Sequence, residues 1–246
     1  MTIIDRAVRV LPKWLTEKVP RDHWETDDAF HRRRKVVVGT AIAGAGVLGA
    51  SLSTKPDSAQ FYWLTAATAA TWVIGGAASG PLHLGRIRGP AGTLRRPVAT
   101  PVALGVGAFG LFYGAALVAR RIPVLNRAIS SVLQYADEGN NGLVLLATLS
   151  NGAAEEVFFR GALYAALREK NSVAASTGVY MLATLATRNP ALVLASGVMG
   201  TLFGLQRRAS GGIQAPLLTH LTWSSLMLRY LPPLFRPPAA AAALSA

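Results

Sequence analysis

The stretch LVLLATLSNGAAEEVFFRGALYAAL, residues 143–167, decides the fold. It is apolar enough and long enough to cross a bilayer as a helix, which takes about 20 residues. Yet it contains two adjacent carboxylates, Glu155 and Glu156, with Arg160 four residues after the second. An ionisable group at membrane depth costs at least ~2.5 to 3.5 kcal/mol, so such residues indicate a functional site by default. These two acids are the only ones in the apolar segments of the chain.

The composition of the chain predicts a polytopic membrane protein. Hydrophobic residues make up 51% of the 246 residues and charged residues only 15%. We expect an all-α, polytopic integral membrane helical bundle with about seven transmembrane helices, a count of six to eight being compatible with the apolar runs. The expected spans are residues 36–53, 61–80, 98–119, 143–167, 172–187, 190–206 and 211–231. Residues 122–135, which Arg127 interrupts, fit an interfacial helix better than a crossing.

The chain divides into three parts. Residues 1–35 form a basic tail that begins with the periodicity of an interfacial amphipathic helix, a solvated tail being the alternative. Residues 36–232 form the transmembrane domain, with the site-bearing core at 143–232. Residues 233–246 are rich in proline and alanine, which predicts a disordered end. Glycines within the first and third spans predict faces for close helix packing.

The net charge of +13 is distributed as in a membrane protein, not as in a protein that binds nucleic acid. Basic residues gather beside the ends of apolar runs, and with seven spans the basic loops fall on one side. That side should be cytoplasmic, with the N-terminus inside and the C-terminus outside. Its basic residues are Arg32, Arg33, Arg34, Lys35, Arg86, Arg88, Arg95, Arg96, Arg168, Lys170, Arg207 and Arg208. The absence of cysteine excludes disulfides, thiol catalysis and cysteine-ligated zinc.

Helical spacing suggests partners for the ionisable groups. Glu156 and Arg160 are i and i+4 with the acid first, the better orientation for an ion pair. Glu155 lies about 100° away around an α-helix, so its partner must come from another span. The only histidine in an apolar segment is His220, and Ser224 follows it on the same helical face. We expect Glu155 to face a polar cavity that contains His220.

Three chemical interpretations fit these residues. A carboxylate and an imidazole that meet at membrane depth can hold a water molecule and move protons, which general-base hydrolysis requires. A proton or ion relay would use the same groups, and spacing alone does not separate the two. The Glu156–Arg160 pair could also be purely structural, because buried ion pairs are tolerated when their geometry is good. His220 by itself is most simply a structural histidine.

Two motifs within residues 143–232 resemble those of a known family. EEVFFR, residues 155–160, matches an EExxxR motif, and GGIQAPLLTH, residues 211–220, is similar to a final motif in which a small-residue turn and Ala-Pro precede a histidine. The family is that of the intramembrane glutamate endopeptidases called CPBP or ABI. It includes CAAX prenyl proteases and bacteriocin-processing or immunity proteins.

The resemblance implies a mechanism and a set of site residues. It implies that Glu155 activates a water that attacks a peptide carbonyl, and that Glu156 and Arg160 shape the site and balance its charge. His220 and Ser224 are similar to a pair that supports the oxyanion or the water. No metal or other cofactor is implied, and the zinc motif HExxH is absent. The expected partners are the lipid bilayer, here a bacterial plasma membrane, and a membrane-associated peptide or protein substrate.

One position departs from the family's pattern. The family's Phe-x-x-x-His element is best matched by YMLAT, residues 180–184, which ends in Thr184. Threonine can hydrogen-bond a water but cannot take up a proton near neutral pH. Either His220 does both jobs, or the chain is a non-enzymatic interaction or immunity protein with a degenerate site. A proton-coupled transporter is a third interpretation.

Overall fold

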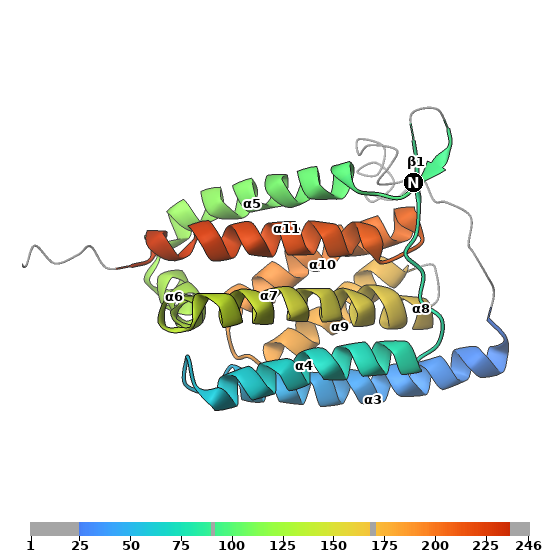
Figure 1. Ribbon diagram of the computed structural model, residues 1–246, viewed down its shortest axis with the longest axis horizontal. Coiled ribbons are helices and arrows are strands. Elements are labelled where there is room, and N and C mark those ends of the chain that lie inside the picture. The colour runs from blue at the N-terminus through green and yellow to red at the C-terminus, as the bar shows by residue number, and fades with distance from the viewer. Residues whose placement is uncertain (1–24, 90–91, 168–170, 237–246) are drawn as a thin grey trace, which may run out of the picture.

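The computed structural model describes residues 25–89, 92–167 and 171–236, which form a bundle of helices (Figure 1). The long helices are α3 (Asp27–Ser51), α4 (Ala59–Ala78), α5 (Ala99–Ala119), α7 (Asn141–Glu155), α9 (Ser172–Leu185), α10 (Pro190–Ser210) and α11 (Gln214–Tyr230). The shorter elements are strands β1 (Ile87–Arg88) and β2 (Leu94–Arg95), helix α6 (Pro123–Glu138), the π-helix η1 (Glu156–Leu163), helix α8 (Tyr164–Ala166) and the 3-10 helix η3 (Pro232–Leu234). The predicted helical class is confirmed, with β1 and β2 as a small antiparallel addition.

Helix α7 and its continuation through η1 and α8 lie in the middle of the bundle (Figure 1). Helices α4 and α11 pack against α7, while α3 packs against α4 and α9, and α5 packs against α11. Helices α9 and α10 pack against each other, and both also contact η1. The predicted motif therefore lies where helices from the two halves of the chain meet.

The turn between α10 and α11 fixes the start of α11. Gly211 ends α10 with a φ of 71°, a left-handed conformation that favours glycine. At Gly212 a β-carbon would lie 2.1 Å from the backbone nitrogen of Gly85, so only glycine permits this approach. These glycines belong to the second motif, and they anchor the helix that carries His220 against the segment before β1.

Aromatic side chains beside the motif fill the core. The ring of Trp72 stacks on Phe158 with 4.7 Å between centroids and packs against Phe159 at 5.0 Å. Gly44 of α3 lies against the same indole, and a β-carbon there would come within 2.2 Å of it. The predicted packing role thus holds for Gly44, whereas nothing lies within 4 Å of the corresponding point at Gly46.

Within the described residues, two segments are long and apolar enough to cross a membrane, judged by length and composition: α5 and the continuous Asn141–Ala166. Helix α5 exposes large apolar side chains, including Val106, Leu111 and Val118. Exposed apolar faces of this kind suit a lipid environment. The count of about seven spans stays a prediction.

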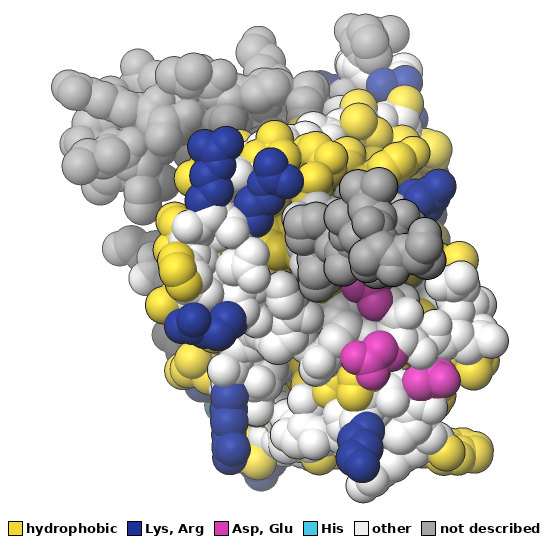
Figure 2. Space-filling model, turned by 90° about the vertical axis from the view of Figure 1, so that its left-hand side faces the viewer, with side chains coloured by type: hydrophobic (Ala, Val, Ile, Leu, Met, Phe, Trp, Pro, Cys, Tyr) yellow, Lys and Arg dark blue, Asp and Glu magenta, His cyan; other side chains and the backbone are white. Residues whose placement is uncertain are grey.

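The two ends of the bundle differ in charge. Helix α6 lies across one end, where the Tyr135 hydroxyl donates to the carbonyl oxygens of Leu52 (3.0 Å) and Thr54 (2.7 Å). Figure 2 looks onto this end and shows Lys and Arg side chains near Asp and Glu. The opposite end carries the hairpin β1–β2, with Arg88 and Arg95 exposed. The interfacial position of residues 122–135 stays a prediction, and the expected amphipathic start of the tail, Arg168 and Lys170 lie outside the described residues.

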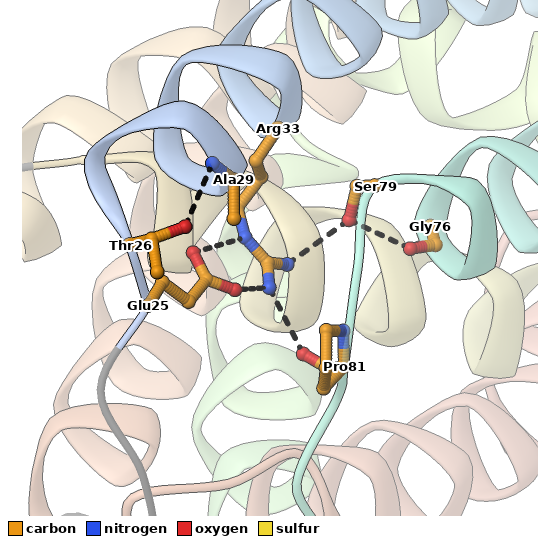
Figure 3. Close-up of polar contacts among 7 residues, drawn as sticks. All are labelled: Glu25, Thr26, Ala29, Arg33, Gly76, Ser79 and Pro81. Atoms are coloured by element: carbon orange, nitrogen blue, oxygen red, sulfur yellow. Dashed lines mark hydrogen bonds and ion pairs between the residues drawn. The ribbon is translucent and has the colours of Figure 1, made fainter.

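Arg33 is buried, at 1% exposure, although the sequence placed it in a basic loop (Figure 3). Its guanidinium pairs with both carboxylate oxygens of Glu25, with 2.9 Å between Nε and Oε2. It also donates to Ser79 Oγ and to the carbonyl oxygen of Pro81, both at 3.1 Å. Burial lowers the pKa of Arg33 from its usual value, but a guanidinium keeps its charge in proteins. The network clamps the start of α3 to the end of α4.

Gly44→Ala should lower the free energy of unfolding by about 1–3 kcal/mol, because overpacking against a rigid ring forces the helices apart. Gly46→Ala is the matched control on the same helix. It should be neutral or should stabilise by up to about 1 kcal/mol, since alanine favours helix over glycine. Thermal unfolding of the two purified variants in detergent tests this, and equal melting temperatures would contradict the packing of α3 on Trp72.

Reporter tags should locate the two ends of the bundle relative to the membrane. A tag after residue 246 and one near Asp57 should be extracytoplasmic, while tags near Arg88 and Arg207 should be cytoplasmic, because basic loops are retained inside. Accessibility of each tag in intact cells is the measurement. A cytoplasmic C-terminus would rule out seven spans without touching the site.

Candidate active site

The central helix changes from α to π geometry at the EEVFFR motif. Helix α7 ends at Glu155, and η1 runs from Glu156 to Leu163. The sequence predicted one α-helix over residues 143–167. The structure corrects this, because Glu156–Leu163 form a π-helix, in which i→i+5 hydrogen bonds widen the turns. The carbonyl oxygen of Arg160 accepts a hydrogen bond of 2.6 Å from Nε of Arg207 on α10. Short π segments are frequent at functional sites.

Glu156 is the most enclosed charged group of the motif, with an exposure of 0%. Its Oε1 lies 3.2 Å from Nη1 of Arg160 and 2.9 Å from Nδ1 of His220. The predicted ion pair between Glu156 and Arg160 is therefore present, and α11 adds a second partner. The other oxygen, Oε2, has no hydrogen-bond partner within the described part of the chain. It remains available to a hydrogen-bond donor that enters the site.

Arg160 is held among aromatic rings. Its guanidinium carbon lies 4.5 Å from the ring centre of Tyr180 on α9 and 4.9 Å from that of Phe203 on α10. The side chain is 1% exposed, and Nε and Nη2 have no hydrogen-bond partner among the described residues. Ring faces attract a cation by about 2 kcal/mol or more when water is excluded. The aromatic cage thus offsets part of the cost of burying this charge.

Glu155 has different neighbours from Glu156 and is only half-buried. Its Oε2 accepts a hydrogen bond of 2.6 Å from the hydroxyl of Tyr180. Among the described residues the imidazole of His220 hydrogen-bonds to Glu156, and the expected polar cavity shared by Glu155 and His220 stays a prediction. Successive residues of a helix point in different directions, so Glu156 faces α11 while Glu155 faces α9.

His220 is fixed by its ring stacking as well as by Glu156. The imidazole stacks on Phe203 with 4.8 Å between centroids. Its Nε2 points towards Gly152, where an added β-carbon would lie 3.4 Å away. Because Nδ1 donates to a carboxylate, Nε2 is the nitrogen left to meet a water or a substrate.

The two hydroxyl residues of the predicted site lie at its edge. Both Thr184 and Ser224 are buried. The hydroxyl of Thr184 donates to the carbonyl oxygen of Tyr180, at 2.8 Å, within its own helix. Ser224 lies one turn beyond His220 on α11. Among the described residues, no hydrogen bond joins either hydroxyl to Glu155 or Glu156, and their roles in the site stay predictions.

Tyr180 is the residue that the sequence analysis missed. It is the first residue of the YMLAT element, at the position where the family has phenylalanine. A tyrosine in an apolar helix usually finds a hydrogen-bond partner for its hydroxyl when it is buried. That rule could have suggested a partner for Glu155.

No group of three or more His, Asp or Glu side chains within the described residues could hold a metal ion.

The sequence around the motif matches a known protein family. Residues 139–226 match the model of the type II CAAX prenyl endopeptidase Rce1-like family. The match includes every predicted site residue, from Glu155 to Ser224, and it confirms the resemblance found from the motifs. This is a family of proteases that are integral membrane proteins. No curated protein and no solved structure matches the chain.

Arg160→Ala should destabilise the protein by about 3–5 kcal/mol, because it leaves Glu156 buried without its cation. The matched control is Arg121→Ala, which removes an arginine from the exposed surface near α6 and should change stability by less than about 0.5 kcal/mol. Melting temperature and yield in detergent measure the difference. Equal stability of the two variants would mean that Glu156 does not depend on this pair.

Proposed function

We propose that this protein is an intramembrane endopeptidase in which Glu155 activates water to hydrolyse peptide bonds of membrane-associated substrates. One observation carries the proposal: a half-buried carboxylate stands beside a fully buried network of Glu156, Arg160 and His220. Glu155 keeps part of its surface exposed, whereas the carboxylate of Glu156 is paired with Arg160 and His220. The match to a protease family over the same residues supports an endopeptidase activity.

The reaction is a general-base hydrolysis. The carboxylate of Glu155 takes one proton from a water molecule while the water oxygen attacks the peptide carbonyl carbon. The carbonyl oxygen becomes an oxyanion. The N–H at Nε2 of a protonated His220 would stabilise it by donating a hydrogen bond. When the carbon–nitrogen bond breaks, Glu155 returns its proton to the departing nitrogen, so a carboxylic acid and an amine leave. No metal or other cofactor enters this sequence of steps.

The charges of the cluster suit this chemistry. With His220 protonated, two carboxylates face one guanidinium and one imidazolium, so the net charge of the buried group is zero. The bond from Nδ1 to Glu156 orients the imidazole. The same bond would hold Nε2 towards the substrate. Ser224, one turn along α11, would support this position.

The setting of the reaction follows from the composition. We propose a bacterial plasma membrane, with the N-terminus in the cytoplasm and the lipid bilayer as the main partner. The substrate would be a membrane-associated peptide or protein, and the family description makes prenylated C-termini the first class to test. Nucleic acid is not a proposed partner, because the basic residues lie beside apolar helices.

A second candidate is a non-enzymatic interaction or immunity protein. The observation in its favour is the hydroxyl of Thr184, which is bonded to its own helix where the family has a histidine. In that case the charged cluster would be retained for structure alone.

Glu155→Gln should abolish cleavage of a membrane-anchored peptide by the purified protein while leaving the melting temperature equal or higher, because it removes a costly charge and keeps the shape. The control Glu138→Gln, at the exposed end of α6, should keep full activity. The panel should include prenylated and unprenylated peptides, with products identified by mass spectrometry.

A cleavage activity that survives in Glu155→Gln would disprove the glutamate mechanism. If neither the wild-type protein nor Thr184→His cleaves any peptide of the panel, the non-enzymatic candidate is the better account.

A further inference from the structure

Helix α9 supplies a polar group to Glu155 from an unexpected position. Thr184 matches the position of the family's histidine, but its hydroxyl donates a hydrogen bond to the carbonyl oxygen of Tyr180. One turn earlier, the hydroxyl of Tyr180 donates to Oε2 of Glu155 at 2.6 Å. The only hydrogen bond that Glu155 receives from a side chain among the described residues therefore comes from α9, but from its tyrosine.

The ring of Tyr180 is fixed on both sides, so the direction of its hydroxyl is fixed as well. One contact is with the Arg160 guanidinium, 4.5 Å from the ring centre. The other is with Phe159, whose ring centre lies 4.6 Å away. Gly200 of α10 keeps the space behind the ring open, because a β-carbon there would lie 3.2 Å from Cδ1 of Tyr180. Three residues from two elements, η1 and α10, thus determine where the hydroxyl lies.

We propose that Tyr180 is the positioning residue of this site, and that it does for Glu155 what a histidine on α9 would otherwise do. The proposal rests on the proposed function of Glu155 as the base. The tyrosine hydroxyl occupies Oε2, which leaves Oε1 to take the proton from water. It also stabilises the carboxylate form, because a hydrogen bond to a charged group favours that charge.

The two neighbouring acids have different hydrogen-bond partners. Glu156 bonds to Arg160 and His220, whereas the side-chain hydrogen bond to Glu155 among the described residues comes from Tyr180. Arg160 connects the two, since it pairs with Glu156 and packs on the ring of Tyr180. A packing role for Tyr180 would need only its ring, whereas a positioning role needs its hydroxyl.

Tyr180→Phe separates the two roles, since it keeps the ring and removes only the hydroxyl. The matched control is Tyr113→Phe on α5, which removes a hydroxyl from a tyrosine that packs on Phe109 away from the site. Tyr180→Phe should reduce kcat by about tenfold or more, the size expected for a lost hydrogen bond to a charged group. KM should stay within about twofold, because the hydroxyl does not touch substrate. The loss of activity on the acid side should begin at higher pH than in wild type.

A second measurement does not depend on a substrate. A hydrophobic carbodiimide reacts with protonated carboxyl groups, so its rate of reaction with Glu155 reports how well the carboxylate form is held. At neutral pH, Tyr180→Phe should increase labelling of the peptide that contains Glu155 several-fold, as measured by mass spectrometry, and Tyr113→Phe should not. Loss of the label in Glu155→Gln identifies Glu155 as the labelled residue.

A rescue variant returns to the cleavage assay. Thr184→His added to Tyr180→Phe should restore part of the activity.

The outcomes distinguish the positioning role of Tyr180 from the proposed function of Glu155. If Glu155→Gln is inactive while Tyr180→Phe keeps the wild-type kcat, the positioning role is overturned and the proposed function stands. Unchanged carbodiimide labelling in Tyr180→Phe overturns the positioning role as well. If the wild-type protein cleaves no peptide, the proposed function fails, and the positioning role fails with it.

Discussion

The carboxylate of Glu156 has no exposed surface, and the rest of the site depends on keeping its charge satisfied. Removing an ion from water costs several kcal/mol even after the protein relaxes, and only close partners with good geometry repay it. Arg160 comes from the same helix and His220 from α11, so the two bonds to Glu156 can form only when these helices are packed together. The network is therefore a consequence of the tertiary fold and also a reason for it.

The cost extends beyond the first pair, because each partner of Glu156 must be accommodated in turn. Within the described residues, Nε and Nη2 of Arg160 have no oxygen acceptor, and the rings of Tyr180 and Phe203 lie beside the guanidinium. Phe203 also stacks on His220, so one aromatic ring serves both partners. The apolar character of α9 and α10 is thus compatible with the charges they surround.

Residues close in sequence were easier to predict than residues brought together by folding. The Glu156–Arg160 pair followed from i, i+4 spacing, and the location of the helices followed from run lengths. The partner of Glu155 did not, because two adjacent acids differ only in which neighbouring helix each one faces. The π-helix escaped for another reason: a hydrophobic pattern over eight residues is compatible with either kind of turn. Arg33 looked like a loop charge because its partners, Glu25, Ser79 and Pro81, meet only in the folded chain.

The π-helix η1 makes the number of residues in the motif as important as their identity. Each residue turns a helix by a fixed angle, about 100° in an α-helix and less in the wider turns of η1, so deleting one between Glu156 and Leu163 would rotate the parts of the helix on either side against each other. Glu155 would then leave α9, and the carbonyl oxygen of Arg160 would lose its place beside Arg207. Insertions and deletions are therefore excluded from this segment even at positions such as Val157, whose side chain takes no part in the charged network.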